Sequence, residues 1–128
     1  MAEIRTFRDL IVWQKAHLLV LEIYKITANF PREEIYGLVS QMRRAAVSVS
    51  SNLVEGFKRR TVFDSLHFYN LADSSLEELK YQLLLSRDLG YSGDEIYNKI
   101  NFLTEEVSKL LRSWSESQKQ NFKKATKT

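Results

Sequence analysis

The residues best suited to chemistry are concentrated in the stretch QMRRAAVSVSSNLVEGFKRR, residues 41–60. This stretch has the pattern of a helix for most of its length, yet it is rich in small, polar and charged residues rather than leucines. When each residue is turned by about 100°, one side of the helix carries a polar row. The row consists of Gln41, Arg44, Ser48, Ser51, Asn52 and Glu55. Such a stretch borders a reactive site, packs unusually closely against other helices, or presents basic residues to an anionic partner. These residues are Arg43, Arg44, Lys58, Arg59 and Arg60.

No pattern in the chain completes a catalytic or metal site. Its two histidines, His17 and His67, lack the repeated Glu-x-x-His pairs with which four-helix bundles hold two metals. The serines have no positioned base, and the four glycines are dispersed rather than gathered into a phosphate-binding loop. We therefore expect a protein that is not an enzyme and that uses no metal, cofactor or small-molecule substrate.

The polar row of residues 41–60 therefore has a structural interpretation. Arg44 and Glu55 lie three helical turns apart, about 16 Å, so they cannot pair with each other. Glu55 can pair with Arg59, whereas a buried Arg44 needs a carboxylate from Glu77, Glu78 or another subunit. Two hypotheses stay open: a solvated polar face, or an ordered polar seam between helices or subunits. The seam would contain Arg44, Ser48, Asn52 and Glu55.

Length and composition predict one domain. A chain of 128 residues with 44% apolar content supports one continuous core but not two. The start MAEIRTFRDL is charged, and the apolar runs are short, so we expect no membrane segment and a cytoplasmic location. The absence of cysteine excludes disulfides and thiolate zinc sites and fits a reducing compartment.

The positive charge of the chain is unevenly distributed. The net charge is +3, but the segment SQKQNFKKATKT contains four lysines and no acid, which leaves 3 − 4 = −1 for the rest. These lysines are Lys119, Lys123, Lys124 and Lys127. The polar composition of the segment predicts a bundle domain over residues 1–116 and a flexible basic tail over residues 117–128.

Apolar periodicity predicts four helices. The first three cover residues 9–28, 34–57 and 62–89, and the fourth begins after Ser92. Thr61 is the expected N-cap of the third helix, Gly90 its stop, and Ser92 with Glu95 a capping box for the fourth. The first helix is expected to bury Trp13, Ala16, Val20, Ile23, Tyr24 and Thr27. The second is expected to bury Leu38, Met42, Ala45, Ala46, Val49, Leu53, Gly56 and Phe57, and the third Tyr69, Ala72, Leu76, Leu79 and Leu83. Short connections between long helices favour antiparallel neighbours, so we expect an all-α, up-down-up-down four-helix bundle.

Several apolar residues lie outside the predicted core faces of the first two helices. One four-helix core cannot bury all of them, and a monomer would leave them in water. They are Ile11, Leu18, Leu21, Val47 and Val54. We therefore expect these residues to form contacts between copies of the chain.

Three segments together resemble the four-helix-bundle family of 23S rRNA intervening-sequence proteins. They are FRDLIVWQKAHLLVLEIYKITANFP, YGLVSQMRRAAVSVSSNLVEGFKRR and LADSSLEELKYQLLLSRDLGY. The similarity runs from about Phe7 to Trp114, and among its specific pieces are Arg43-Arg44-Ala45, Glu55-Gly56 and the pair Ser75 and Glu78. That pair joins the expected polar seam.

The resemblance implies more than a bundle. It implies assembly into a ring-like homo-oligomer, typically a homopentamer, with no known catalytic activity. A more distant branch with the same fold, the accessory variability proteins of diversity-generating retroelements, implies binding to a reverse transcriptase and to nucleic acid. The ring agrees with the surplus apolar residues noted above.

Basic residues suggest what such an oligomer binds. Repeated around a ring, they would combine weak phosphate contacts into useful avidity for structured RNA. The candidates are Arg43, Lys58, Arg59, Arg60, Lys119, Lys123, Lys124 and Lys127. The alternative hypothesis is a scaffold that binds only proteins, for example a reverse transcriptase, with Lys58, Arg59 and Arg60 serving as a solvated helix end.

Overall fold

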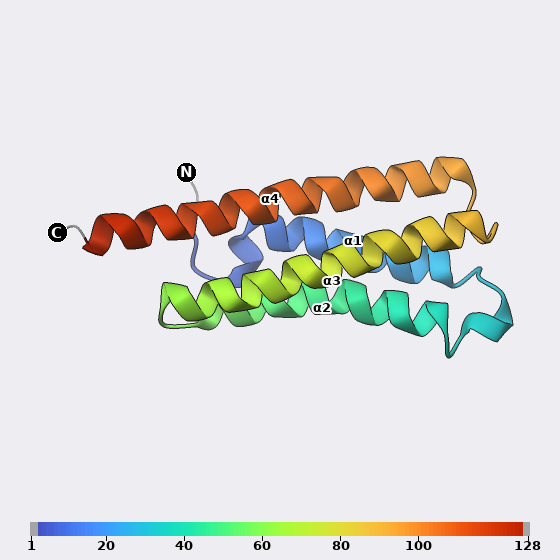
Figure 1. The fold of residues 1–128 in the computed structure, drawn as a ribbon, viewed down its shortest axis with the longest axis horizontal. Helices are drawn as coiled ribbons and strands as arrows, with labels where there is room; N and C mark the ends of the chain where they lie inside the picture. Colours follow the sequence, from blue (N-terminus) through green and yellow to red (C-terminus); the bar gives the residue numbers. More distant parts are fainter. Residues whose placement is uncertain (1–2, 127–128) are drawn as a thin grey trace.

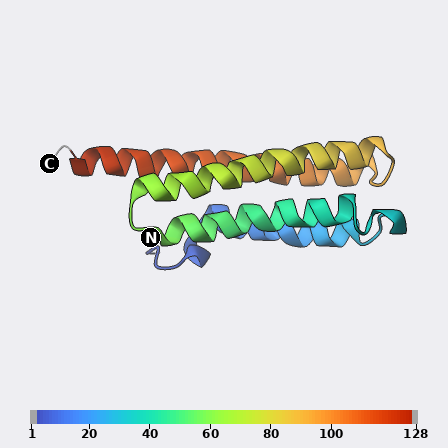
Figure 2. The same cartoon turned by 60° about the horizontal axis from the view of Figure 1, so that its bottom comes forward.

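The computed structural model describes residues 3–126, and within them the chain forms four α-helices, two short 3-10 helices and no strands (Figure 1). The elements are η1 (Phe7–Asp9), α1 (Ile11–Thr27), η2 (Arg32–Glu34), α2 (Leu38–Lys58), α3 (Val62–Asp88) and α4 (Asp94–Thr126). Both α1 and α3 pack against α2 and α4 (Figure 2). The predicted four-helix bundle, with consecutive helices antiparallel, is confirmed. No helix in this part of the chain is long and apolar enough to cross a membrane.

Local signals define both ends of α3. Thr61 Oγ1 accepts a hydrogen bond from the Asp64 N–H at 3.1 Å, as predicted for an N-cap. At the other end Gly90 adopts φ 80°, which places it in the left-handed region. The Tyr91 and Gly90 N–H groups then bond back to the carbonyls of Ser86 and Arg87, each at 2.9 Å. This Schellman arrangement ends the helix where the sequence predicted.

The predicted capping box of the fourth helix is wrong. Helix α4 begins at Asp94, and its first hydrogen bond runs from the Tyr97 N–H to the Gly93 carbonyl at 2.9 Å. Ser92 therefore lies one residue before the capping position, and its buried hydroxyl has no partner among the described residues. A capping box was assigned because Ser92 and Glu95 have the right spacing, but the same helix can start one residue later.

The buried faces of α2 and α3 agree with the periodicity, whereas that of α1 does not fully. All five residues expected on the core face of α3 are buried: Tyr69, Ala72, Leu76, Leu79 and Leu83. In α1, Val12 and Leu19 are buried, while Tyr24 is exposed and Trp13 only half-buried. Because α1 packs between α2 and α4, its core-facing direction is turned away from the predicted stripe.

The predicted flexible tail continues as helix. Helix α4 extends to Thr126 and projects past the α2–α3 connection (Figure 1). The segment SQKQNFKKA has no proline or glycine, and it extends a helix that is already nucleated by packing. The side chains of residues 119–124 are exposed, so packing does not hold this last part of α4.

Candidate nucleic-acid interface

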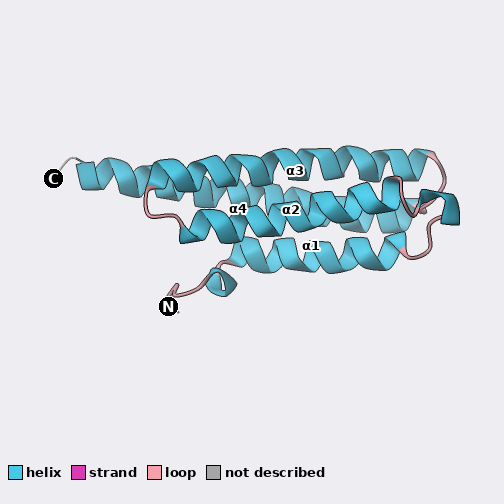
Figure 3. Ribbon diagram, turned by 90° about the horizontal axis from the view of Figure 1, so that it is seen from below, coloured by secondary structure: helices cyan, strands magenta, loops and turns pink. Residues whose placement is uncertain are grey.

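The antiparallel topology brings two basic segments to one end of the bundle. Helix α2 ends, α3 begins and α4 ends at this same end (Figure 3). Six exposed cations therefore share it, although the two segments are far apart in the sequence. We call them the basic end: Lys58, Arg59, Arg60, Lys119, Lys123 and Lys124. Lys127, also predicted to bind nucleic acid, lies outside the described residues.

Members of the basic end differ in how they are engaged. Arg59 pairs with Glu55, as the sequence predicted, and its guanidinium lies 4.5 Å from the centre of the Phe68 ring. Lys119 pairs with Glu116 at 3.2 Å. Lys58, Arg60 and Lys124 form no ion pair with any of residues 3–126. These three cations are therefore the most available for an external anion.

Two exposed aromatic rings accompany the cations. Phe63, in the first turn of α3, is 82% exposed, and Phe122 on α4 is 52% exposed. Rings in this position can stack on unpaired bases, whereas the cations contact phosphates. Neither ring was predicted from the sequence as part of a binding surface. The sequence did place Phe63 three residues after Arg60, at the start of the third helix, and this spacing could have indicated a ring beside the cations.

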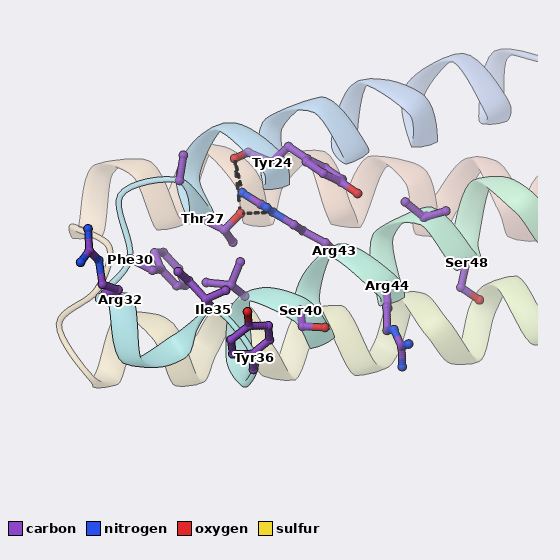
Figure 4. Close-up of a pocket in the computed structure, with 13 residues that line it drawn as sticks. Tyr24, Thr27, Phe30, Arg32, Ile35, Tyr36, Ser40, Arg43, Arg44 and Ser48 are labelled. Atoms are coloured by element: carbon purple, nitrogen blue, oxygen red, sulfur yellow. Dashed lines mark hydrogen bonds between the residues drawn. The ribbon is translucent and has the colours of Figure 1, made fainter.

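Arg43 does not belong to this surface (Figure 4). Its Nε donates to Thr27 Oγ1 at 2.9 Å and its Nη2 to the Tyr24 carbonyl oxygen at 3.4 Å. The guanidinium also lies 4.6 Å from the centre of the Tyr24 ring. The arginine therefore joins α2 to the C-terminal turn of α1, where a cation favourably meets the helix dipole. Its prediction as a nucleic-acid contact is replaced by a structural role.

The expected polar seam is partly present between α2 and α3. The hydroxyls of Ser48 and Ser75 lie 2.7 Å apart, and Asn52 Nδ2 donates to Ser48 Oγ at 3.0 Å. These three half-buried residues link the two helices. Glu78 instead accepts a bond from Gln82 on its own helix at 3.1 Å. Glu55, which pairs with Arg59, likewise stays outside the seam.

Arg44 has no carboxylate partner among residues 3–126, so its predicted pairing with helix three does not occur within the chain. Its side chain is exposed and points away from Arg43 and Thr27 (Figure 4). A solvated cation carries no burial penalty, which is why the single chain tolerates it. Pairing with another subunit stays a prediction.

Four of the five apolar residues predicted to lie outside the core are exposed in the single chain. Ile11 is 60% and Leu21 54% exposed. Leu18 and Val47 are also exposed, whereas Val54 is half-buried. The bundle core therefore leaves Ile11, Leu18, Leu21 and Val47 uncovered.

The histidines take part in ring contacts rather than in a polar cluster. His17 stacks on Trp13 with ring centres 5.0 Å apart, and His67 lies edge-on to Phe68. Among the described residues, no three metal-binding side chains converge.

Residues 8–113 match the family described as 23S rRNA-intervening sequence protein, so the chain belongs to that family. The sequence-based assignment is thereby confirmed. A similar solved structure is that of a protein of unknown function from the S23 ribosomal protein family of Bacteroides thetaiotaomicron. The two share 26% sequence identity and a TM-score of 0.74, over 82% of this chain and 98% of the other. No curated protein matches the chain.

Proposed function

We propose that this protein is a non-enzymatic, homo-oligomeric bundle that binds structured RNA, or an RNA-containing complex, through its basic end. The observation that carries the proposal is the meeting of Lys58–Arg60 with the lysines of α4 at one end of the bundle. Sequence separation gives no reason for these segments to share a surface. The antiparallel topology brings them to the same end of the bundle.

The chemistry of the basic end favours phosphates over base edges. Lys58, Arg60 and Lys124 have no ion pair among the described residues, and lysine and arginine contacts to phosphate position a nucleic acid without reading its sequence. Phe63 adds a ring for an unpaired base. Binding should therefore depend on the shape of the RNA and on single-stranded loops rather than on duplex sequence.

Assembly supplies the affinity that one copy lacks. Six cations, among them Arg59 and Lys119 with intramolecular partners, form a modest site for one protomer. Linking several copies converts later contacts into intramolecular ones and raises the overall affinity. The exposed Ile11, Leu18, Leu21 and Val47 support assembly. Family resemblance favours a ring-shaped homopentamer, and the cysteine-free sequence favours a cytoplasmic location. We assign no catalytic residue and no cofactor.

The test is binding of a structured 23S rRNA fragment at several salt concentrations. The triple variant Lys58→Gln, Arg60→Gln, Lys124→Gln should weaken binding and reduce its salt dependence, because fewer counterions are released. The matched control changes three exposed lysines away from the basic end: Lys25, Lys99 and Lys109 to glutamine. Absence of binding, or a flat salt response, would contradict the RNA proposal and favour the protein scaffold, for which a reverse transcriptase is one candidate partner.

A further inference from the structure

A groove between α1 and α2 combines apolar walls with a single sign of charge (Figure 4). Its volume is about 940 Å³, and its lining includes Arg32, Arg43 and Arg44 but no aspartate or glutamate. Tyr36 stands exposed at its edge, and the buried Val39 contributes to its wall. We call this feature the arginine groove. Its composition fits an occupant that is both apolar and acidic.

The outward side of α3 has the opposite character. Glu77 and Glu78 are exposed there, together with the apolar residues Leu71, Tyr81 and Leu84. The two cations of the same helix lie to one side, toward α4. Lys80 pairs with Glu77 of its own helix at 2.9 Å and with Glu105 of α4 at 3.2 Å, and Arg87 lies 4.6 Å from the Tyr97 ring centre. Glu78 is therefore the carboxylate of this surface that has no ion pair among the described residues. We call the surface of Leu71, Glu77, Glu78, Tyr81 and Leu84 the acidic face.

Both surfaces lie at the same level along the bundle. The Ser48–Ser75 hydrogen bond, 2.7 Å long, fixes the register of the antiparallel α2 and α3. On α2, Arg44 lies four residues from Ser48, which is about 6 Å along the helix axis. On α3, Glu78 lies three residues from Ser75, about 4.5 Å toward the same end of the bundle. Tyr81 lies about 9 Å along, level with the part of the groove formed by residues 39–48. A second copy placed beside the first at the same height would therefore bring opposite charges together.

We propose that the arginine groove of one copy is the docking site for the acidic face of a second copy. Arg44 then pairs with Glu78 of the neighbour, and the neighbour's Tyr81 enters the groove. The inference rests on the homo-oligomer part of the proposed function and names its interface. The match explains why Arg44 has no carboxylate partner among residues 3–126 and why Tyr81 is 62% exposed.

The two surfaces are different, so the contact is heterologous and forms either a closed ring or an open filament. Rotation about an axis parallel to the helices keeps every residue at its level, as the match of Arg44 with Glu78 requires. The contact therefore forms a closed ring, and the basic ends of all copies lie on one rim, where they can engage one RNA together.

Charge reversal tests the pairing. Arg44→Glu and Glu78→Arg each place like charges opposite each other at every contact, so each should weaken assembly on the order of a hundredfold. The double variant Arg44→Glu, Glu78→Arg restores opposite charges and should regain the wild-type mass by light scattering at micromolar concentration. Lys109→Glu, an exposed cation on α4, is the matched control and should assemble normally. Circular dichroism checks that every variant remains helical.

Mixing the two single variants separates a contact between copies from one within a chain. Copies carrying Arg44→Glu should bind copies carrying Glu78→Arg, because the reversed groove of the first meets the reversed face of the second. A ring with an odd number of copies cannot alternate the two variants throughout, so the readout is co-purification of differently tagged copies, not the mass of a closed ring. If the double variant assembles but the two single variants do not bind each other, the pair lies within a chain and the inference is wrong. Assembly unaffected by either reversal places the interface elsewhere and leaves homo-oligomerisation standing. If the wild-type protein is a monomer, both the inferred interface and the proposed homo-oligomer are wrong. RNA binding is measured in a separate experiment.

Discussion

The backbone of Gly56 on α2 lies directly against the ring of Tyr69 on α3. A β-carbon at residue 56 would fall 2.4 Å from Tyr69 Cε1 and 3.1 Å from the Ser65 carbonyl oxygen. Ser65 Oγ also donates a hydrogen bond to the Gly56 carbonyl at 2.7 Å. The absence of a side chain at Gly56 therefore lets α2 and α3 approach closely just before the segment that carries Lys58 and Arg60.

Gly56→Ala should destabilise the protein. Tyr69 is only 2% exposed, so its ring cannot move aside freely. Overpacking costs about 1–3 kcal/mol, which exceeds the gain of about 1 kcal/mol from alanine in a helix. Urea unfolding should show the lower stability. Ser51→Ala, at an exposed position of the same helix, should be neutral or slightly stabilising, and equal behaviour of both variants would contradict the close-approach argument.

Arg43 and Arg44 should behave differently although they are adjacent. Arg43→Ala removes the bonds to Thr27 and Tyr24 and should lower the free energy of unfolding by about 1–2 kcal/mol, as expected for a charged donor. Arg44→Ala should leave the unfolding free energy of the dissociated chain unchanged. Chemical unfolding at high dilution measures both. RNA affinity per folded protomer should not change with Arg43→Ala, and a selective decrease in affinity would restore its binding role.

This pair also shows what the sequence can and cannot predict. Residues 43 and 44 differ by about 100° around the helix, so one meets α1 and the other points outward. Periodicity locates the stripe that faces the core, which is why Leu76, Leu79 and Leu83 were assigned correctly. It does not say which neighbouring helix borders each flank. The role of Arg43 depends on that neighbour, and so it required the structure.

The location of the basic end could not be predicted from the sequence either. Its cations were predicted individually from their charge, but their common location follows from the antiparallel order of four helices. The helical state of residues 117–126 was missed because polar composition predicts disorder when a segment is considered alone. Continuation from the packed part of α4 removes the cost of helix nucleation, which composition does not include.

Lys80 should make stability depend on pH in the alkaline range. Partial burial by itself lowers the pKa of Lys80, but hydrogen bonds to Glu77 and Glu105 outweigh it and raise the pKa above the usual 10.5. A raised pKa in the folded state means that the ion pairs stabilise the fold fully below pH 10.5 and less as the pH rises through the folded-state value.

Lys80→Met tests this pH dependence. The variant should lose about 1 kcal/mol of unfolding free energy at neutral pH, because the ammonium bridges two helices and is largely covered. The difference from wild type should shrink above pH 10.5. Lys109→Met is the control, since Lys109 is exposed and has no ion pair among the described residues. A constant difference between wild type and Lys80→Met across this range would show that the ion pairs of Lys80 do not account for the difference in stability.

Deleting residues 119–128 should separate folding from RNA binding. The side chains of residues 119–124 are exposed, so the bundle core does not depend on them, and the melting temperature and the mass of the assembly should stay at wild-type values. The deletion removes Lys119, Lys123, Lys124 and Lys127. RNA affinity should fall, and the slope of its logarithm against the logarithm of salt concentration should decrease by roughly 0.7–0.9 for each phosphate that the protein no longer neutralises.

A full-length variant with these four lysines changed to glutamine keeps the projecting part of α4 and isolates the effect of charge. It should reproduce the decrease in salt slope caused by the deletion, and any larger loss of affinity in the deletion reflects uncharged contacts such as those of Phe122. Adding Lys58→Gln and Arg60→Gln to the deletion should then remove most of the remaining binding, because only Arg59, held by Glu55 and Phe68, is left of the basic end. If the truncated protein, folded and assembled, binds RNA with unchanged affinity and salt slope, the projecting part of α4 does not touch phosphate. If the additional glutamines also change nothing, the RNA site lies elsewhere or the protein is a scaffold for other proteins.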